Sequence, residues 1–112
     1  MTDGPVLLDV RADHAGGQTT VHLTGVLDMS TVGLLRETIE PLLRDGADVV
    51  VDLSEVTFCD STGLGAIVTL HRRAGMDEAT FALRSPRQRV AAVLKMTGVD
   101  QVVPVHQDRP AT

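Results

Sequence analysis

Hydrophobic and polar positions along this chain of 112 residues follow two different periods. Residues 6–10 form a short apolar run, and residues 19–24 alternate between apolar and polar side chains, which is the period of a half-buried strand. Residues 14–18, which lie between these segments, contain two adjacent glycines and are typical of a turn. We therefore expect an antiparallel hairpin of two strands near the start of the chain.

The next segment has apolar residues spaced by three and four, as in a helix with one buried face. We predict this helix over residues 29–44, with Asp28 or Ser30 as its N-cap. Pro41 is expected to kink the helix or to mark its last turn. The residues expected to share the buried face are Val32, Leu35, Ile39 and Leu42.

Two further helices are predicted in the second half of the chain. One spans residues 61–74 and is closed by Gly75. The other begins at residues 85–88, where Ser85 is the expected N-cap, a proline follows and a glutamine completes a capping box, and it stops at Gly98. The expected buried positions are Leu64, Ile67, Val68 and His71 in the first helix, and Val90, Val93 and Leu94 in the second.

Apolar runs between the helices predict three more strands, at residues 49–53, 80–83 and 102–105, the last at a sheet edge because of Pro104. The order is then β-β-α-β-α-β-α-β. Strands that alternate with helices indicate an α/β domain whose sheet is mainly parallel. We expect a single domain over residues 1–112, with a loose polar tail from residue 107.

Composition narrows the class of partner. Hydrophobic residues make up 43% of the chain, but it has two phenylalanines and neither tryptophan nor tyrosine, so the core is expected to be aliphatic. Few aromatic residues and a net charge of −5 both argue against nucleic-acid binding. The single cysteine, Cys59, allows no internal disulfide and is interpreted as a small buried hydrophobe. With neither a signal peptide nor a membrane-spanning run recognised, a cytoplasmic location is expected.

The most informative segment is residues 49–68, where a β-branched run leads through a short linker into a helix. Ser61 and Thr62 open this helix, and Gly63 and Gly65 lie in its first turn. Glycine costs about 1 kcal/mol relative to alanine inside a helix. Two glycines here indicate that close backbone approach matters more than helix stability, as on a docking or phosphate-binding surface.

Two enzymatic or nucleotide-binding readings of this segment have little support. A nucleophilic Ser61 would need the Gly-x-Ser-x-Gly pattern, but residue 59 is cysteine, and the histidines that follow Ser61 are His71, on the expected core face, and His106. Residues 63–65, Gly-Leu-Gly, are too short for a Walker or dinucleotide fingerprint, and no lysine follows them.

Two other readings concern carboxylates and phosphorylation. Asp28, Asp52 and Asp60 lie at or near predicted strand ends and could together hold Mg²⁺, although helix capping explains Asp28 and Asp60 better. Ser61 could be a regulatory phosphoacceptor, because a helix N-terminus tolerates the added charge. From the residues alone, Ser61 as a simple helix cap and Ser61 as a phosphoacceptor remain equally supported.

The pattern of residues 52–65, Asp-Leu-Ser-x-Val-x-Phe-x-Asp-Ser-Thr-Gly-Leu-Gly, resembles the signature of STAS domains, in particular the bacterial anti-sigma factor antagonists. Residues 25–28, Gly-Val-Leu-Asp, match the family's Gly-x-Leu-Asp junction, and the element order matches over about the whole chain. Cys59 is a small departure, since a bulkier apolar residue is common there. The resemblance implies a mixed sheet of four to five strands with helices packed mainly on one side.

The resemblance also implies a function and partners. The unphosphorylated protein would bind an anti-sigma factor that is also a GHKL-type serine kinase, and so release the sigma factor. The kinase would phosphorylate Ser61, and a PP2C-type phosphatase would reverse this. The chain itself would be a kinase substrate without enzymatic activity, cofactor or metal, and a monomer or weak dimer. Partner contacts would fall on Asp28, Asp60, Ser61, Thr62, Gly63, Leu64 and Gly65.

Two alternatives follow from the same resemblance, because STAS domains also act as accessory subunits of ABC-type transporters and as scaffolds of stress-sensing complexes. The intact sequence of residues 60–62, Asp-Ser-Thr, and the length of a stand-alone domain favour the sigma-regulatory function.

Overall fold

The computed structural model describes residues 7–107 and begins with the predicted hairpin. Strands β1 (Leu8–Ala15) and β2 (Gln18–Leu27) pair antiparallel, with Ala15 opposite Gln18. Gly16 and Gly17 form the turn with φ of 62° and 80°, values that favour glycine. A turn with this backbone conformation matches the right-handed twist of the two strands. The first strand is longer than predicted, and Val6 and the tail at 108–112 lie outside the described residues.

The sheet has five strands in the order β1-β2-β3-β4-β5, and every pair after the hairpin is parallel. This confirms the predicted mixed and mainly parallel α/β sheet. The remaining elements are α1 (Val32–Arg44), β3 (Asp48–Cys59), α2 (Ser61–Met76), β4 (Thr80–Arg84), α3 (Gln88–Met96), the 3₁₀ helix η1 (Val99–Gln101) and β5 (Val105–His106).

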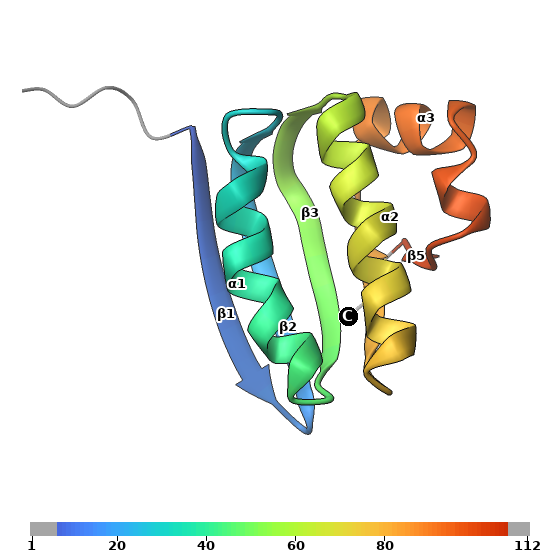
Figure 1. Cartoon of the computed structure of the whole chain (residues 1–112). Coiled ribbons are helices and arrows are strands. Elements are labelled where there is room, and N and C mark those ends of the chain that lie inside the picture. The colour runs from blue at the N-terminus through green and yellow to red at the C-terminus, as the bar shows by residue number, and fades with distance from the viewer. Residues whose placement is uncertain (1–6, 108–112) are drawn as a thin grey trace, which may run out of the picture.

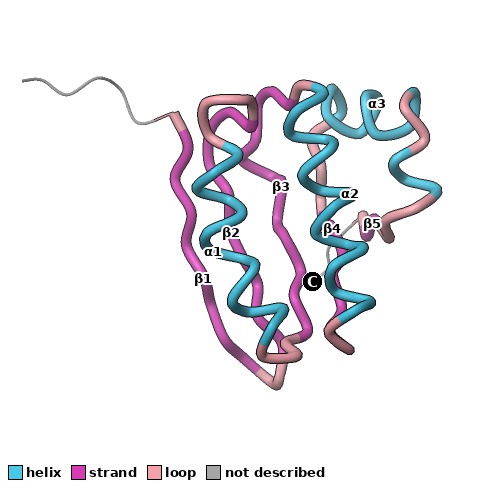
Figure 2. The backbone as a smooth tube through the Cα atoms, viewed as in Figure 1, coloured by secondary structure: helices cyan, strands magenta, loops and turns pink. Residues whose placement is uncertain are grey.

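Helices α1 and α2 lie side by side across one face of the sheet, and α3 lies beyond them near β5 (Figures 1 and 2). The core fills the space between these helices and the sheet, and it is aliphatic apart from Phe81 and Cys59. Alternate residues of β3 point into it because side chains in a strand alternate between faces. Its best buried members include Leu35, Ile39, Leu43, Val49, Val51, Leu53, Leu70 and Leu83.

The opposite face of the sheet is polar. Asp52 of β3 accepts a hydrogen bond from Arg84 of β4, with Nη2 and Oδ2 2.8 Å apart. The same carboxylate oxygen lies 3.8 Å from Nδ1 of His22 on β2. This row of polar side chains crosses the three central strands where helices α1 and α2 do not cover them.

Two strand predictions need correction. The segment read as a linker, residues 54–60, is largely strand: β3 continues to Cys59 and pairs with β2 through register shifts near Gly25. These shifts break the period of two, so the pattern of buried positions was hidden in the sequence. The last strand is only Val105–His106, because residues 99–101 form η1 and Pro104 has no N–H to donate.

The predicted start of the first helix is also wrong. Helix α1 begins at Val32 with Thr31 as its N-cap, rather than at residue 29 with Asp28 or Ser30. The Asp28 carboxylate accepts hydrogen bonds from the Ser30 N–H and hydroxyl, which makes a turn before the helix. Pro41 lies in the last turn, as predicted. Leu43 is fully buried, whereas Val32 and Leu42 are only partly buried.

The other helix ends differ in similar ways. Helix α2 passes through the exposed Gly75 and ends at Met76, and its buried face includes Leu70 and Ala74, while His71 is half-buried. Helix α3 has Arg87 as its N-cap and no capping box. Ser85 instead has a φ of 55° and donates its N–H to the carbonyl of His106 at 2.7 Å. Val90 and Leu94 are buried as predicted, with Val93 packed partly against the core.

Candidate functional site

The predicted site lies where β3 ends and α2 begins. Asp60 is the N-cap of α2, and its carboxylate accepts a hydrogen bond from the Gly63 N–H at 3.0 Å. Its own N–H donates to the carbonyl of Leu27 at 3.1 Å, which ties the start of α2 to the end of β2. The capping role predicted for Asp60 is confirmed. Ser61 is the first residue of the helix and not its cap, so the simple-cap interpretation of Ser61 is wrong.

Ser61 and Thr62 are both exposed at the first turn of α2. Within residues 7–107 their backbone N–H groups have no hydrogen-bond acceptor, because the capping carboxylate is used by Gly63 and the Asp60 carbonyl by Leu64. Unpaired N–H groups and the helix dipole make this end of α2 favourable for a negative charge. The serine hydroxyl therefore lies at an accessible and locally positive position.

The loop between β2 and α1 lies beside this helix start, since Asp60 is hydrogen-bonded to Leu27. Thr31, which is buried, donates its hydroxyl to the Val26 carbonyl at 2.8 Å and accepts from the Asp28 N–H at 2.9 Å. The hydrogen bond from the Ser30 hydroxyl, with further bonds in the same turn, holds the pKa of Asp28 below its usual range despite some desolvation. The loop thus presents an ionised carboxylate in a fixed conformation.

The two glycines of α2 have different environments. A Cβ at Gly63 would lie 2.9 Å from the Cys59 sulfur and 2.9 Å from both the carbonyl oxygen and Cγ of Leu27. A Cβ at Gly65 would meet nothing within 4 Å. Gly63 and Leu64 are buried, whereas Gly65 is exposed. Close approach at Gly63 is therefore an internal contact between α2 and β2, and the exposed surface consists of Ser61, Thr62 and Gly65.

Features that the sequence reasoning missed surround this helix start. Met29 and Phe58 are 75% and 50% exposed, which is high for large apolar side chains. Phe58 and Cys59 also line a pocket of about 150 Å³ that is closed on the other side by α3. Burial, and next the Asp60 charge, raise the pKa of Cys59 to about 11, so this thiol stays protonated. The residues that α3 contributes to the pocket are Arg89, Val90 and Val93.

The alternative chemistries find no support in this geometry. Among residues 7–107 no group of three histidine, cysteine or acidic side chains is placed to hold a metal ion. Asp28 and Asp60 are engaged in their local turns, and Asp52 is paired with Arg84. His71 lies ten residues along α2 from Ser61, or about 15 Å at the rise of a helix.

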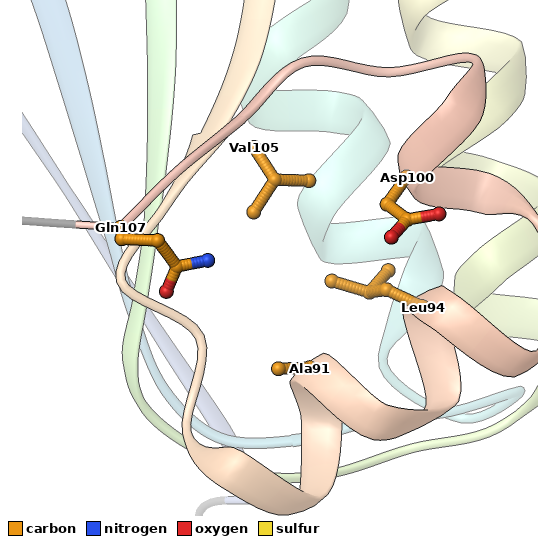
Figure 3. Close-up of a pocket in the computed structure, with 5 residues that line it drawn as sticks. All are labelled: Ala91, Leu94, Asp100, Val105 and Gln107. Atoms are coloured by element: carbon orange, nitrogen blue, oxygen red, sulfur yellow. The ribbon is translucent and has the colours of Figure 1, made fainter.

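A second pocket, of about 180 Å³, lies between α3, η1 and β5 (Figure 3). Asp100 and Gln107 line opposite sides of this pocket, and the apolar side chains of Ala91, Leu94 and Val105 line the rest. One carboxylate oxygen of Asp100 is buried without a hydrogen-bond partner among the described residues. This pocket contains none of the predicted site residues.

Fold and site together define a small mixed α/β domain whose second helix begins with two exposed hydroxyl residues. A family model described as "Mlab, STAS domain" matches residues 10–104. The chain therefore belongs to the STAS domain family, as the signature indicated.

No helix in the described part of the chain is long and apolar enough to cross a membrane.

Individual relatives agree with this family. The chain is 28% identical over 85 residues to the anti-sigma-B factor antagonist of Bacillus subtilis (strain 168), covering 76% of this chain and 78% of that protein. It is similar to the crystal structure of an anti-sigma factor antagonist from Mycobacterium paratuberculosis, with a TM-score of 0.80, 25% identity and coverage of 88% and 84%. It also shares the fold of the Bacillus cell fate determinant SpoIIAA in its phosphorylated form, with a TM-score of 0.67, 19% identity and coverage of 87% and 90%.

Proposed function

We propose that this protein is an anti-sigma factor antagonist controlled by phosphorylation of Ser61. In its unphosphorylated form it binds an anti-sigma factor that is also a GHKL-type serine kinase, and the sigma factor is released. Relatives named as anti-sigma factor antagonists support the binding function. The observation that carries the switch is the exposed hydroxyl of Ser61 in the first turn of α2, next to N–H groups without an acceptor in the described chain.

Electrostatics at this position explain why phosphorylation would change binding without unfolding the domain. A phosphoserine carries roughly −1.5 to −2 charges at neutral pH. The dipole and free N–H groups of α2 favour that charge, although Asp60 next to it opposes it. Because Ser61 is exposed, the phosphate adds charge and bulk to the surface. A partner surface that fits the free serine then meets added charge and bulk that it does not accommodate, so binding weakens.

The proposed contact surface combines the first turn of α2 with the β2–α1 loop. Asp28 and Asp60 provide carboxylates at its rim, while Ser61, Thr62 and Gly65 provide small exposed positions. Gly63 and Leu64 support this surface from beneath, since both are buried. The ATP and Mg²⁺ needed for phosphorylation belong to the partner kinase, and a PP2C-type phosphatase restores the free serine.

The test compares Ser61 variants in binding to the kinase partner by calorimetry. Ser61→Ala should fold and bind like the wild type, whereas Ser61→Glu should fold but bind at least about tenfold more weakly, as a like-charge or unpaired-charge contact does. Thr69→Glu is the control, because it adds the same charge to an exposed position of α2 about 12 Å further along the helix. Equal affinity of the two Ser61 variants would contradict the switch.

A second candidate is an accessory subunit of an ABC-type transporter, a function that other STAS domains perform. It remains compatible with the match to the family model described as "Mlab, STAS domain". Purification of the protein with a permease and an ATPase, rather than with a small kinase, would support this candidate.

A further inference from the structure

We propose that the pocket between Phe58 and α3 is a second contact site for the anti-sigma partner, alongside the surface around Ser61. It would receive an apolar side chain of the partner, and a carboxylate next to that side chain would pair with Arg89. This inference rests on the proposed function, because it names a further part of the same interface. We call the site the α3 pocket; its lining residues are Phe58, Cys59, Arg89, Val90 and Val93.

The position of the α3 pocket makes it continuous with the proposed switch surface. Phe58 and Cys59 end β3 and directly precede Asp60, the N-cap of α2. Helix α3 lies at the same end of the sheet as the start of α2 (Figure 1). A partner that covers Ser61 therefore reaches this pocket without leaving the end of the molecule.

The residues that line the α3 pocket are those expected at a protein–protein interface: an exposed aromatic side chain beside buried apolar ones. Phe58 leaves half of its surface exposed, although burial of a phenylalanine side chain is favourable. Val90 is 2% exposed and is held by the core, so the floor is rigid, and Val93 packs partly against the same core. Apolar pockets on rigid elements, with a charged rim, are where partners anchor a side chain.

Charge at the rim specifies the kind of partner segment. Three arginines lie close together before and within the start of α3, in a chain whose net charge is −5. Arg84 pairs with Asp52 at 2.8 Å, and Arg87 lies 3.6 Å from Glu55 while donating to the Ser54 carbonyl. Arg89 is exposed and forms no ion pair with any residue in the described range. Its guanidinium is therefore available for a carboxylate of the partner.

The experiment measures the affinity of unphosphorylated variants for the purified anti-sigma partner. Phe58→Ala and Arg89→Glu should each weaken binding by about tenfold or more, as expected for an anchor residue and for a reversed charge. The matched controls are Met76→Ala and Arg44→Glu, exposed positions at the far ends of α2 and α1. Both controls should bind within about twofold of the wild type, since they lie outside the interface.

The outcomes of this experiment distinguish a failure of the α3 pocket from a failure of the proposed function. Thermal unfolding of Phe58→Ala should show an intact domain, and the effect of Arg89→Glu should shrink as salt is added. If both pocket variants bind like the wild type while Ser61→Glu does not, the α3 pocket is not part of the interface and the proposed function stands. If Phe58→Ala instead abolishes self-association in sedimentation and leaves partner affinity unchanged, the pocket's occupant is a second copy and the inference is overturned. A wild-type protein that binds no anti-sigma factor overturns both proposals.

Discussion

Gly63 and Gly65 show how two identical residues in one helical turn can serve different purposes. Gly63 is required by the packing of α2 on β2, because any side chain there would meet Leu27 and Cys59. Gly65 faces open space, so nothing inside the domain requires a glycine at that position. Of the two glycines, only Gly65 therefore fits the prediction that small residues leave room for a partner at this surface.

This difference predicts opposite effects of the same substitution on stability. Gly63→Ala should lower the free energy of unfolding by about 1–3 kcal/mol, the usual cost of an overpacked core. Gly65→Ala should raise it by up to about 1 kcal/mol, because alanine is the better helix former. Urea unfolding of the two variants measures both effects. A stabilised Gly63→Ala variant would show that the Leu27 contact does not limit this position.

The same residues show what the sequence could reveal about the site. The start of α2 at Ser61 and the capping role of Asp60 were predicted correctly because helix capping depends on a few neighbouring residues. Phe58 and Arg89 were missed because their proximity depends on how α3 packs beside the end of β3. The spacing of residues 58 and 89 along the sequence does not indicate that both line one pocket.

At the scale of elements, the strands are joined on their polar face by the carboxylate of Asp52. It accepts the Ser54 N–H at 2.8 Å and pairs with Arg84 of β4. Burial alone raises the pKa of Asp52, but the hydrogen bonds from Ser54 and Arg84 lower it by more, so its pKa lies below its usual range. A depressed pKa means that the folded state favours the ionised form.

Asp52 should therefore contribute stability that depends on pH. Its contribution is present above the unfolded-state pKa and is lost as pH falls through the lower pKa of the folded state. Asp52→Asn should lower the free energy of unfolding at pH 7 by about 1–2 kcal/mol, since hydrogen bonds to charged groups are lost. The difference from the wild type should shrink at pH 3.

Urea unfolding at the two pH values tests this, with Asp9→Asn as the control because Asp9 is exposed on β1. An Asp52→Asn protein that loses as much stability between pH 7 and pH 3 as the wild type would contradict the prediction.

The order of elements was predictable because each period of apolar residues reports one buried face. The element boundaries were not, and the errors have a common physical cause. The Asp28 side chain, expected to cap a helix, is hydrogen-bonded within a turn instead. Ser85, also an expected cap, precedes the N-cap of α3 by two residues, and its N–H is bonded to the edge strand β5. At residues 54–59 the register shift against β2 hides the strand. Each of these depends on tertiary pairing that a local pattern does not contain.

At the scale of the whole molecule, one end of the sheet collects everything that the proposed function needs. The β2–α1 loop, the start of α2 and helix α3 all lie at that end (Figure 1). The polar row of His22, Asp52 and Arg84 on the other face of the sheet contains none of the predicted contact residues. A rigid aliphatic core holds these three segments in fixed positions. A phosphate on Ser61 would therefore change the surface at this end while the core remains intact.

The most direct measurement is the affinity of the wild-type protein for its anti-sigma partner before and after stoichiometric phosphorylation at Ser61, determined by calorimetry with the site verified by mass spectrometry. We expect tight binding of the unphosphorylated form and binding roughly a hundredfold weaker or more once the phosphate is present, because a phosphate covered by a partner that fits the free serine is left unpaired, and a buried unpaired charge costs several kcal/mol. The two forms should unfold at similar temperatures. Equal affinity of the two forms would contradict the proposed switch.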